Sequence, residues 1–331
     1  MSDRSPQRLI GESPALADLL DRTSELAPLH RPVLVIGERG TGKELVAERL
    51  HFLSSRWQQP LIKVNCAAIS ESLLDADLFG YEPGAFTGAN RTHIGRFERA
   101  HEGTLFLDEV GNMSAPLQEK LLRLIEYGEF ERLGGQKTLT VDVRIVAATN
   151  EDLPSLVAQG RFRSDLLDRL AFDVLTLPPL RARQGDVQLL AEQFAIQMSS
   201  ELGWSMFPGF SEAALEALNQ HPFHGNVREL KNVIERSLYR WGNEAEAVEQ
   251  LVLDPFDSPW RPGKASAEVS LADGSFNDQV ARFEIGLLEA ALERHERHQG
   301  KAAESLGLTY HQFRSQLRKH GLIGGARPKS H

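Results

Sequence analysis

The first half of the chain alternates short apolar runs with longer stretches of helical spacing. The apolar runs are rich in β-branched residues, and they are VLVIG (33–37), LIKVN (61–65), TLFLD (104–108), RIVAAT (144–149) and FDVLTL (172–177). Runs of this length and composition predict buried strands. Because helical segments lie between them, the pattern predicts an α/β fold with a parallel sheet.

The strand-like runs stop near Asp186. The segments QLLAEQFAIQMSSEL, EAALEALNQ and NVRELKNVIERSLYR follow with helical spacing, and DPFDSPWRPGKASAEVSLADGS has the composition of a linker. A last helical block begins near Phe276. We therefore predict four parts, which are an α/β domain at 1–178, a small helical domain at 179–253, a linker at 254–275 and a C-terminal module at 276–331.

The charge of the chain is unevenly distributed. The 331 residues carry a net charge of −9, which argues against a protein that coats nucleic acid in general. From Gln299 to the end there are six Lys or Arg residues and one acid, so this segment is +5 and the remainder is −14. A basic end on an acidic body predicts a separate nucleic-acid-binding module.

Targeting signals and disulfides are not expected. The first residues lack the apolar core of a signal peptide, and no apolar run reaches the roughly 18 residues of a membrane helix. The single cysteine, Cys66, cannot form a disulfide within one chain and is expected to be a small buried hydrophobe. We expect a cytoplasmic protein, associated with the nucleoid when it binds DNA, that does not insert into membranes.

The segment that follows the first predicted strand matches the phosphate-binding pattern G-x-x-x-x-G-K. Backbone N–H groups of such a loop surround phosphates, the following helix adds its positive dipole, and Lys43 reaches the β- and γ-phosphates. Position 44 usually carries a hydroxyl ligand for Mg²⁺, and here it is Glu44. The candidate ATP-binding residues of this loop are Gly37, Glu38, Arg39, Gly40, Thr41, Gly42, Lys43 and Glu44.

The motif TLFLDE supplies groups that can coordinate Mg²⁺ in place of the missing hydroxyl ligand. Asp108, at the end of a buried strand, is placed to hold Mg²⁺ directly or through water. Glu109 can polarise the attacking water. The alternative is a solvated acidic pair at a strand end. The two motifs together predict Mg²⁺-dependent ATP hydrolysis.

The hexapeptide GAFTGA (84–89) lies between the two nucleotide motifs. With GTLFLDE, FRSDLLDRL, LPPLRAR and HGNVRELKN, it resembles the bacterial enhancer-binding proteins, the AAA+ ATPases that activate sigma-54 RNA polymerase. The resemblance runs from about Leu9 to Leu322. It implies an AAA+ P-loop core with a helical lid, which forms a homo-hexamer and remodels the polymerase while bound to upstream enhancer DNA, and it implies a role in the phage shock response to envelope stress.

The resemblance also assigns the polar residues at the strand ends. Asn65 is similar to the switch that pairs with Glu109 and reports the nucleotide state, and its alternative is an asparagine in a strand-end turn. Thr149, which ends the RIVAAT run, and Asn150 after it resemble the residues called sensor I. These roles are implied by the family and not by the spacing of the residues.

Three arginines are assigned in the same way. Arg163 and Arg169 in FRSDLLDRL resemble arginine fingers that act on a neighbouring subunit, and the alternative is ordinary surface ion pairing. Arg228 in GNVREL resembles sensor II, on a helix that Asn226 could cap.

The resemblance gives GAFTGA a role outside nucleotide binding. In the family this loop projects from the hexamer and touches sigma-54 in an ATP-dependent way. Phe86 would supply an apolar contact, and Thr87 a hydroxyl. The alternative is a buried glycine-rich turn with a core phenylalanine. The candidate sigma-54 contacts are Gly84, Ala85, Phe86, Thr87, Gly88 and Ala89.

The C-terminal block predicts a helix-turn-helix. KAAESLG forms a short helix ending at Gly307, and Thr309 caps the next helix, YHQFRSQLRKH. The arrangement resembles the Fis-type module, whose second helix would enter the major groove. A helical hairpin for dimerisation is the alternative, and the basic charge disfavours it. The candidate DNA contacts are Thr309, Tyr310, His311, Gln312, Arg314, Ser315, Arg318 and Lys319.

The start of the chain bears on how the activity of the protein is regulated. Fewer than a dozen residues precede Gly11, where the family normally has a sensory domain. We therefore expect a separate inhibitor, and the resemblance implies one similar to phage shock protein A. Trp57 in LSSRWQQP is the candidate docking residue, since tryptophan is favoured at interfaces. Partly buried packing is the alternative for this side chain.

Two other functions stay open at this point. One is another AAA+ machine, such as a helicase loader, whose loop grips DNA or protein in a pore. The other is a DNA-binding repressor with a nucleotide site that does not hydrolyse ATP. The hexapeptide disfavours the first, and the intact set of Lys43, Asp108, Glu109, Arg163 and Arg169 disfavours the second.

Overall fold

The computed structural model describes residues 9–258, 261, 276–295 and 297–322. The chain consists of two compact units, Met1–Pro255 and Phe256–His331. Residues 1–8, most of the predicted linker at 254–275, and the basic end with Arg327 and Lys329 lie outside the described residues.

All five predicted runs form strands of one parallel sheet. In chain order these strands are β1 (Val33–Ile36), β2 (Leu61–Asn65), β3 (Thr104–Asp108), β6 (Arg144–Thr149) and β7 (Val174–Thr176). Their order across the sheet is β2-β3-β6-β1-β7, with each neighbouring pair parallel. The prediction of a parallel α/β core is confirmed.

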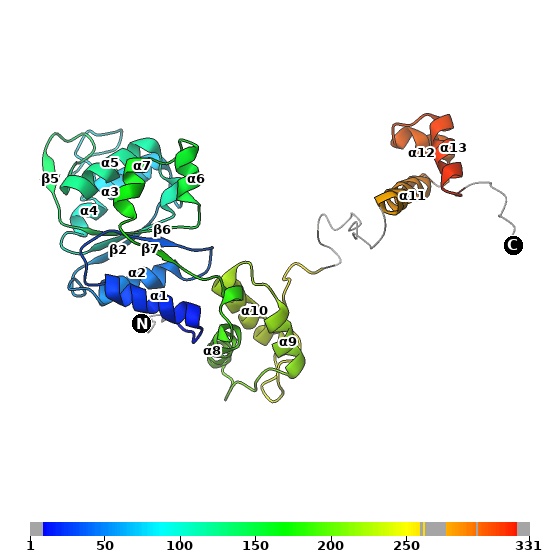
Figure 1. Ribbon diagram of the computed structural model, residues 1–331, viewed down its shortest axis with the longest axis horizontal. Coiled ribbons are helices and arrows are strands. Elements are labelled where there is room, and N and C mark those ends of the chain that lie inside the picture. The colour runs from blue at the N-terminus through cyan, green and yellow to red at the C-terminus, as the bar shows by residue number, and fades with distance from the viewer. Residues whose placement is uncertain (1–8, 259–260, 262–275, 296, 323–331) are drawn as a thin grey trace. The chain divides into compact units, whose positions relative to one another are not determined.

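The sheet is covered by helices on both faces, which explains why its strands read as continuous apolar runs. Along β3, Leu105 and Leu107 belong to one buried cluster, while Phe106 between them belongs to the other. Figure 1 shows α1 and α2 on one side of the sheet, with α3, α5 and α7 on the opposite side. The helices of this domain are α1 (Pro14–Leu26), α2 (Lys43–Phe52), α3 (Glu71–Phe79), α4 (Arg96–Arg99), α5 (Ala115–Tyr127), α6 (Leu153–Ala158) and α7 (Ser164–Leu170).

A small antiparallel hairpin was not predicted from the sequence. It consists of β4 (Glu129–Glu131) and β5 (Thr138–Thr140). Its strands are three residues long and mostly polar, so they carry no readable alternation. The hairpin is joined to the segment before GAFTGA, because Glu82 N donates to Leu133 O at 2.9 Å.

The helical domain contains three main helices, α8 (Asp186–Glu201), α9 (Glu212–Gln220) and α10 (Asn226–Trp241). They enclose their own buried cluster, as the helical spacing predicted. The domain begins at a short 3₁₀ helix, η2 (Leu180–Ala182). Its start is tied to the N-terminal segment by Asp186, whose carboxylate accepts from Ser13 N at 3.0 Å and from Ser13 Oγ at 2.8 Å.

The second unit contains α11 (Phe276–Arg294), α12 (Gln299–Ser305) and α13 (Tyr310–Lys319). Its core includes Ala302, Ala303, Phe313 and Leu317. Among the described residues, no helix combines the length and the apolar character that crossing a membrane requires.

Candidate functional site

The phosphate loop connects β1 to α2, as the motif requires. Helix α2 begins at Lys43, directly after Gly42. Gly40 and Gly42 have φ values of +78° and +102°, a region that side chains other than glycine rarely occupy. These two positions therefore explain why the motif needs glycine.

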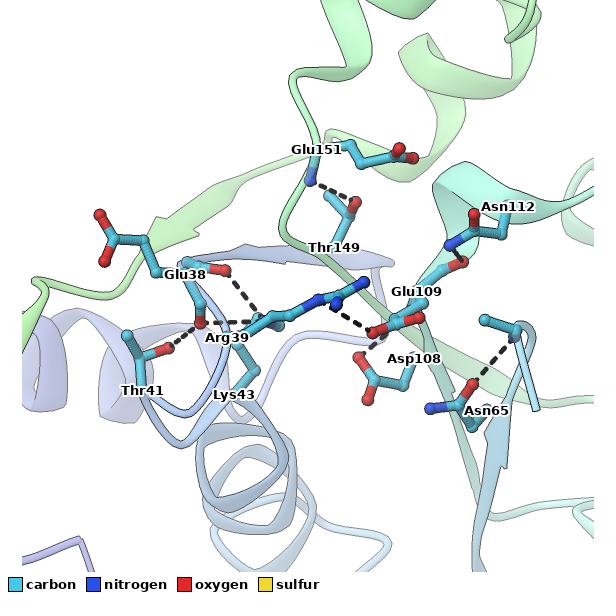
Figure 2. A network of polar contacts seen from close by, with 12 residues as sticks. Glu38, Arg39, Thr41, Lys43, Asn65, Asp108, Glu109, Asn112, Thr149 and Glu151 are labelled. Atoms are coloured by element: carbon cyan, nitrogen blue, oxygen red, sulfur yellow. Dashed lines mark hydrogen bonds and ion pairs between the residues drawn. The ribbon is translucent and has the colours of Figure 1, made fainter. Parts of the chain in front are cut away.

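The lysine of the loop folds back on the loop itself. Lys43 Nζ donates to Gly37 O at 2.9 Å and to Glu38 O at 3.2 Å (Figure 2). Burial lowers the pKa of Lys43, while the charges of Asp108 and Glu109 oppose that shift. The ammonium group of Lys43 thus lies against the backbone of the phosphate loop, within electrostatic reach of Asp108 and Glu109.

The acidic pair follows β3 on the same edge of the sheet (Figure 2). Glu109 N donates to Asp108 Oδ1 at 3.0 Å. Burial raises the pKa of Asp108, and Lys43 opposes that shift. Glu109 has a left-handed φ of +55°, which is uncommon for a residue with a side chain and is typical of functional sites. Arg39 Nε lies 3.9 Å from Glu109 Oε1.

The structure places Asn65 beside this pair without joining it to Glu109. Asn65 and Asp108 are register partners on β2 and β3. The Asn65 side-chain oxygen accepts from Ala67 N at 2.9 Å, which is the strand-end turn that the sequence left as an alternative. Among the described contacts, no hydrogen bond links Asn65 to Glu109.

The two residues compared with sensor I differ in burial. Thr149 is buried at the end of β6, and its hydroxyl accepts from Glu151 N at 3.0 Å. Asn150 is exposed. Thr149 is the last residue of the central strand β6, which lies between β3 and β1, and Asn150 follows it. Both therefore share the sheet edge with the phosphate loop and the acidic pair.

The two predicted arginine fingers lie at α7, and both are paired within the chain. Arg163 donates to Asp165 at 2.7 Å, and Arg169 donates to Glu126 at 2.9 Å. Their side chains remain 40% and 59% exposed. Within the described residues, no ion pair joins either arginine to the phosphate loop. They are therefore accessible to a second chain.

The expectation that Asn226 caps α10 is wrong. The cap position is Gly225, and no side chain caps the helix there. Asn226 is instead the first residue of α10, fully buried, and turned toward the phosphate loop. The hydrogen-bond partners of the Asn226 side chain are distant in sequence, so no short motif could have predicted them. Arg228 lies two residues further along α10 and is exposed.

The GAFTGA segment forms a turn that is exposed at Gly84, Phe86, Thr87 and Gly88, whereas Ala89, also a predicted contact, is buried. Gly84 and Gly88 have φ values of +85° and +100°, and a Cβ at either position would meet nothing within 4 Å. Gly84 N donates to Ala89 O at 2.8 Å, which closes the turn. Phe86 is 46% exposed, and its ring packs against Tyr81. The buried turn with a core phenylalanine, which was the alternative, does not occur.

The base of this turn is fixed by a residue that sequence reasoning missed. Arg132, in the loop after β4, donates to Glu82 Oε1 at 2.5 Å and to Glu98 Oε2 at 2.6 Å. The hairpin also packs against the turn, because a Cβ at Gly134 would lie 2.9 Å from Ala85. In the sequence, only the two adjacent glycines of ERLGGQ indicate that another segment packs closely against this loop.

Trp57 and Cys66 have opposite environments. Trp57 is 55% exposed, so more than half of its surface is accessible to a partner. Phe52 and Leu53, in the same surface segment, are also exposed. Cys66 is buried, as expected, and burial raises the pKa of its thiol to about 12.

The candidate DNA-binding helix is α13. Thr309 caps it, since its hydroxyl accepts from Gln312 N and its own N–H donates to Gln312 Oε1, the reciprocal pair of a capping box. Lys319 donates to Glu284 on α11 at 2.7 Å. All eight predicted DNA contacts are exposed, and they are Thr309, Tyr310, His311, Gln312, Arg314, Ser315, Arg318 and Lys319.

Three families match successive parts of the chain. "Sigma-54 interaction domain" matches residues 9–176, "AAA+ ATPase lid domain" matches 181–253, and "Bacterial regulatory protein, Fis family" matches 279–320. The first match spans the phosphate loop, the acidic pair and the GAFTGA turn. The third spans α12 and α13.

Similar proteins carry the same combination of parts. The chain is 54% identical to the Psp operon transcriptional activator of Escherichia coli, covering 94% of this chain and 97% of that protein. It is 41% identical to regulatory protein AtoC of Escherichia coli, covering 95% and 68%. The structure of NtrX from Brucella abortus in complex with ATP matches with a TM-score of 0.70 at 31% identity, covering 95% and 69%. The chain therefore belongs to the family of sigma-54-dependent transcription activators, in which an AAA+ ATPase is joined to a Fis-type DNA-binding domain.

Proposed function

We propose that this protein forms a hexamer that couples hydrolysis of Mg-ATP to remodelling of sigma-54 RNA polymerase closed complexes. It does so in the cytoplasm, bound to enhancer DNA at the nucleoid, and it activates the phage shock response. The 54% identity to the Psp operon transcriptional activator supports the choice of response. The observation that carries the mechanism is the exposed Phe86, on a turn whose base is fixed to the ATPase domain.

The sheet edge supplies the groups that this chemistry needs. Lys43 and the loop N–H groups hold the β- and γ-phosphates, and Glu109 polarises the attacking water. Asp108 fits a Mg²⁺ site, because carboxylate oxygen is a preferred ligand of this ion and Asp108 faces the lysine of the phosphate loop. When bound, Mg²⁺ would neutralise charge on the phosphates.

The remaining residues act between sites. Thr149 and Asn150 lie at the end of β6, between the strands that lead to the phosphate loop and the acidic pair, where they would sense the γ-phosphate. Asn65 would leave its turn with Ala67 and pair with Glu109 when the nucleotide state changes. Arg163 and Arg169 would leave their intrachain partners and reach the nucleotide of the neighbouring subunit.

Phe86→Ala and Thr87→Ala are each expected to abolish activation while ATP hydrolysis stays within a few fold of the wild-type rate. The reason is that both side chains are exposed on a turn that supplies no phosphate ligand. The measurement is open-complex formation by purified protein with sigma-54 polymerase, alongside steady-state hydrolysis of ATP.

The same assay tests the proposed function as a whole. Promoter opening should require hydrolysable ATP and should fail with a non-hydrolysable analogue. Arg91→Ala, in the exposed segment just after the turn, is a matched control that should still activate. Normal open-complex formation by both turn variants would contradict the assigned contact.

Trp57→Ala is expected to remove inhibition by a protein similar to phage shock protein A. The exposed ring of Trp57, a few positions after the exposed Phe52 and Leu53 in the sequence, offers an apolar docking surface on the ATPase domain. The neighbouring Arg56 is held in place by Asp142 at 2.7 Å, which fixes the segment. The measurement is ATPase activity of both proteins titrated with the inhibitor.

Basal ATPase activity and assembly of the Trp57→Ala protein should match the wild type, because the side chain lies outside the nucleotide site. Leu29→Ala, at another exposed apolar side chain, serves as a control that should keep inhibition. Equal inhibition of the Trp57→Ala and wild-type proteins would exclude this docking site.

A further inference from the structure

A buried asparagine lies at the junction of the lid and the phosphate loop. Asn226 has no exposed surface and holds a left-handed φ of +56°. Asparagine tolerates this conformation better than most residues, but the conformation is still uncommon outside glycine. The surroundings must therefore hold the residue in place, and the contacts of its side chain show how.

The side chain of Asn226 joins three segments that are distant in sequence. Its Oδ1 accepts from Leu180 N at 2.8 Å, at the start of the short helix η2 that leads into the lid. Its Nδ2 donates to Glu38 Oε2 at 3.0 Å and to Arg39 O at 3.0 Å, both in the phosphate loop. The buried amide of Asn226 thus connects η2, the lid helix α10 and the phosphate loop.

The backbone around Asn226 approaches the loop equally closely. Val227 N donates to Gly40 O at 3.1 Å. A Cβ at position 40 would lie 2.2 Å from Gly225 O, so the loop needs glycine there for the lid as well as for its own turn. Any shift of the first turn of α10 would therefore disturb the phosphate loop directly.

Glu38 has a second partner, Arg181, in the short helix η2. Arg181 donates to both carboxylate oxygens, at 2.8 and 2.5 Å, and this pairing, together with the hydrogen bond from Asn226, lowers the pKa of Glu38 to about 2. The arginine pair is about half exposed, and exposed pairs contribute little on their own. The buried amide is the stronger constraint, since a buried polar group left without its partner is costly.

We propose that Asn226 is a positioning residue that holds the start of α10 on the phosphate loop through Glu38, and so fixes where Arg228 faces the nucleotide. The inference rests on the role that the family resemblance implies for Arg228, which is contact with the bound nucleotide. Arg228 follows Asn226 by two residues on the same rigid helix. Anchoring Asn226 therefore sets the position of Arg228 relative to the nucleotide phosphates.

Asn226→Asp tests the contact with little change in shape. The new carboxylate can still accept from Leu180 N, and aspartate also tolerates positive φ. It replaces the donor that faces Glu38 with an acceptor, so two carboxylates oppose each other. With the full chain, we expect the Kd for ATP to rise about tenfold to a hundredfold, as the loss of a hydrogen bond to a charged group implies.

Rescue distinguishes direct pairing from general destabilisation. Adding Glu38→Gln to Asn226→Asp lets the new amide at position 38 donate to the new carboxylate at position 226. We expect this double variant to bind ATP at least about threefold more tightly than Asn226→Asp, but not as tightly as the wild type, because Arg39 O still lacks the donor that Asn226 Nδ2 supplied. Asn243→Asp is the matched control, because Asn243 also lies in the lid and donates to a glutamate, Glu246, at 3.1 Å, in the loop after α10. It should leave ATP affinity unchanged.

Two further variants make the outcome decisive. Asn226→Gly keeps the positive φ and removes the side chain, so it should raise the Kd for ATP even where the aspartate variant folds poorly. Wild-type affinity of the glycine variant, or no rescue by Glu38→Gln, would overturn the proposal. Arg228→Ala separates the two inferences, since normal ATP binding and hydrolysis by this variant would refute the role of Arg228 itself.

Discussion

Replacing Glu109 with glutamine is expected to slow ATP hydrolysis by roughly 10²–10⁴-fold, while ATP binding stays close to the wild-type value. The substitution keeps the size of the side chain and removes only the carboxylate that polarises water. Within the part of the chain that the structure describes, Glu109 makes no hydrogen bond to the phosphate loop, and its ion-pair partner there, Arg39, lies 3.9 Å away. Binding should therefore survive when the chemical step is lost.

The measurement combines equilibrium binding of ATP with steady-state hydrolysis. Glu102→Gln is a matched control, because Glu102 is also a glutamate with a left-handed φ, +61°, but lies on the surface away from the site. It should hydrolyse ATP at the wild-type rate. Turnover by Glu109→Gln that equals the wild type would show that another group activates the water.

Arg163→Ala and Arg169→Ala are each expected to reduce hydrolysis, by up to the roughly 10³–10⁵-fold that arginine fingers contribute in other NTPases. Both side chains are exposed and are held only by intrachain ion pairs. Such exposed pairs are weak, so exchanging them for a nucleotide phosphate costs little. Arg161→Ala, at an exposed arginine in the same segment, is the control and should keep its activity.

Mixing subunits tests whether these arginines act across an interface. An Arg169→Ala chain has an intact phosphate loop, and a Lys43→Ala chain has intact arginines. When the two are mixed, a site with both parts can form between neighbouring subunits, and hydrolysis should recover partly. If both proteins fold and assemble yet no activity returns, the arginines do not act in trans.

The sequence alone determined the features whose residues are consecutive. The five strands of the sheet were predicted because both faces are buried, which makes each strand a continuous apolar run. The phosphate loop and the capped helix α13 were predicted because their hydrogen bonds join residues only a few positions apart. The family resemblance added roles, such as that of GAFTGA, which spacing could not supply.

Only the tertiary structure decided the features that depend on distant partners. Asn226 was expected to cap its helix, yet it bonds to Glu38, which is 188 residues away in the chain. The hairpin β4–β5 and its Arg132 support the GAFTGA turn through contacts that leave no periodic signal. The exposure of Trp57 could not be read from its neighbours either. Local sequence encodes propensity and spacing, whereas burial and long-range hydrogen bonds arise only when the folded chain brings separate segments together.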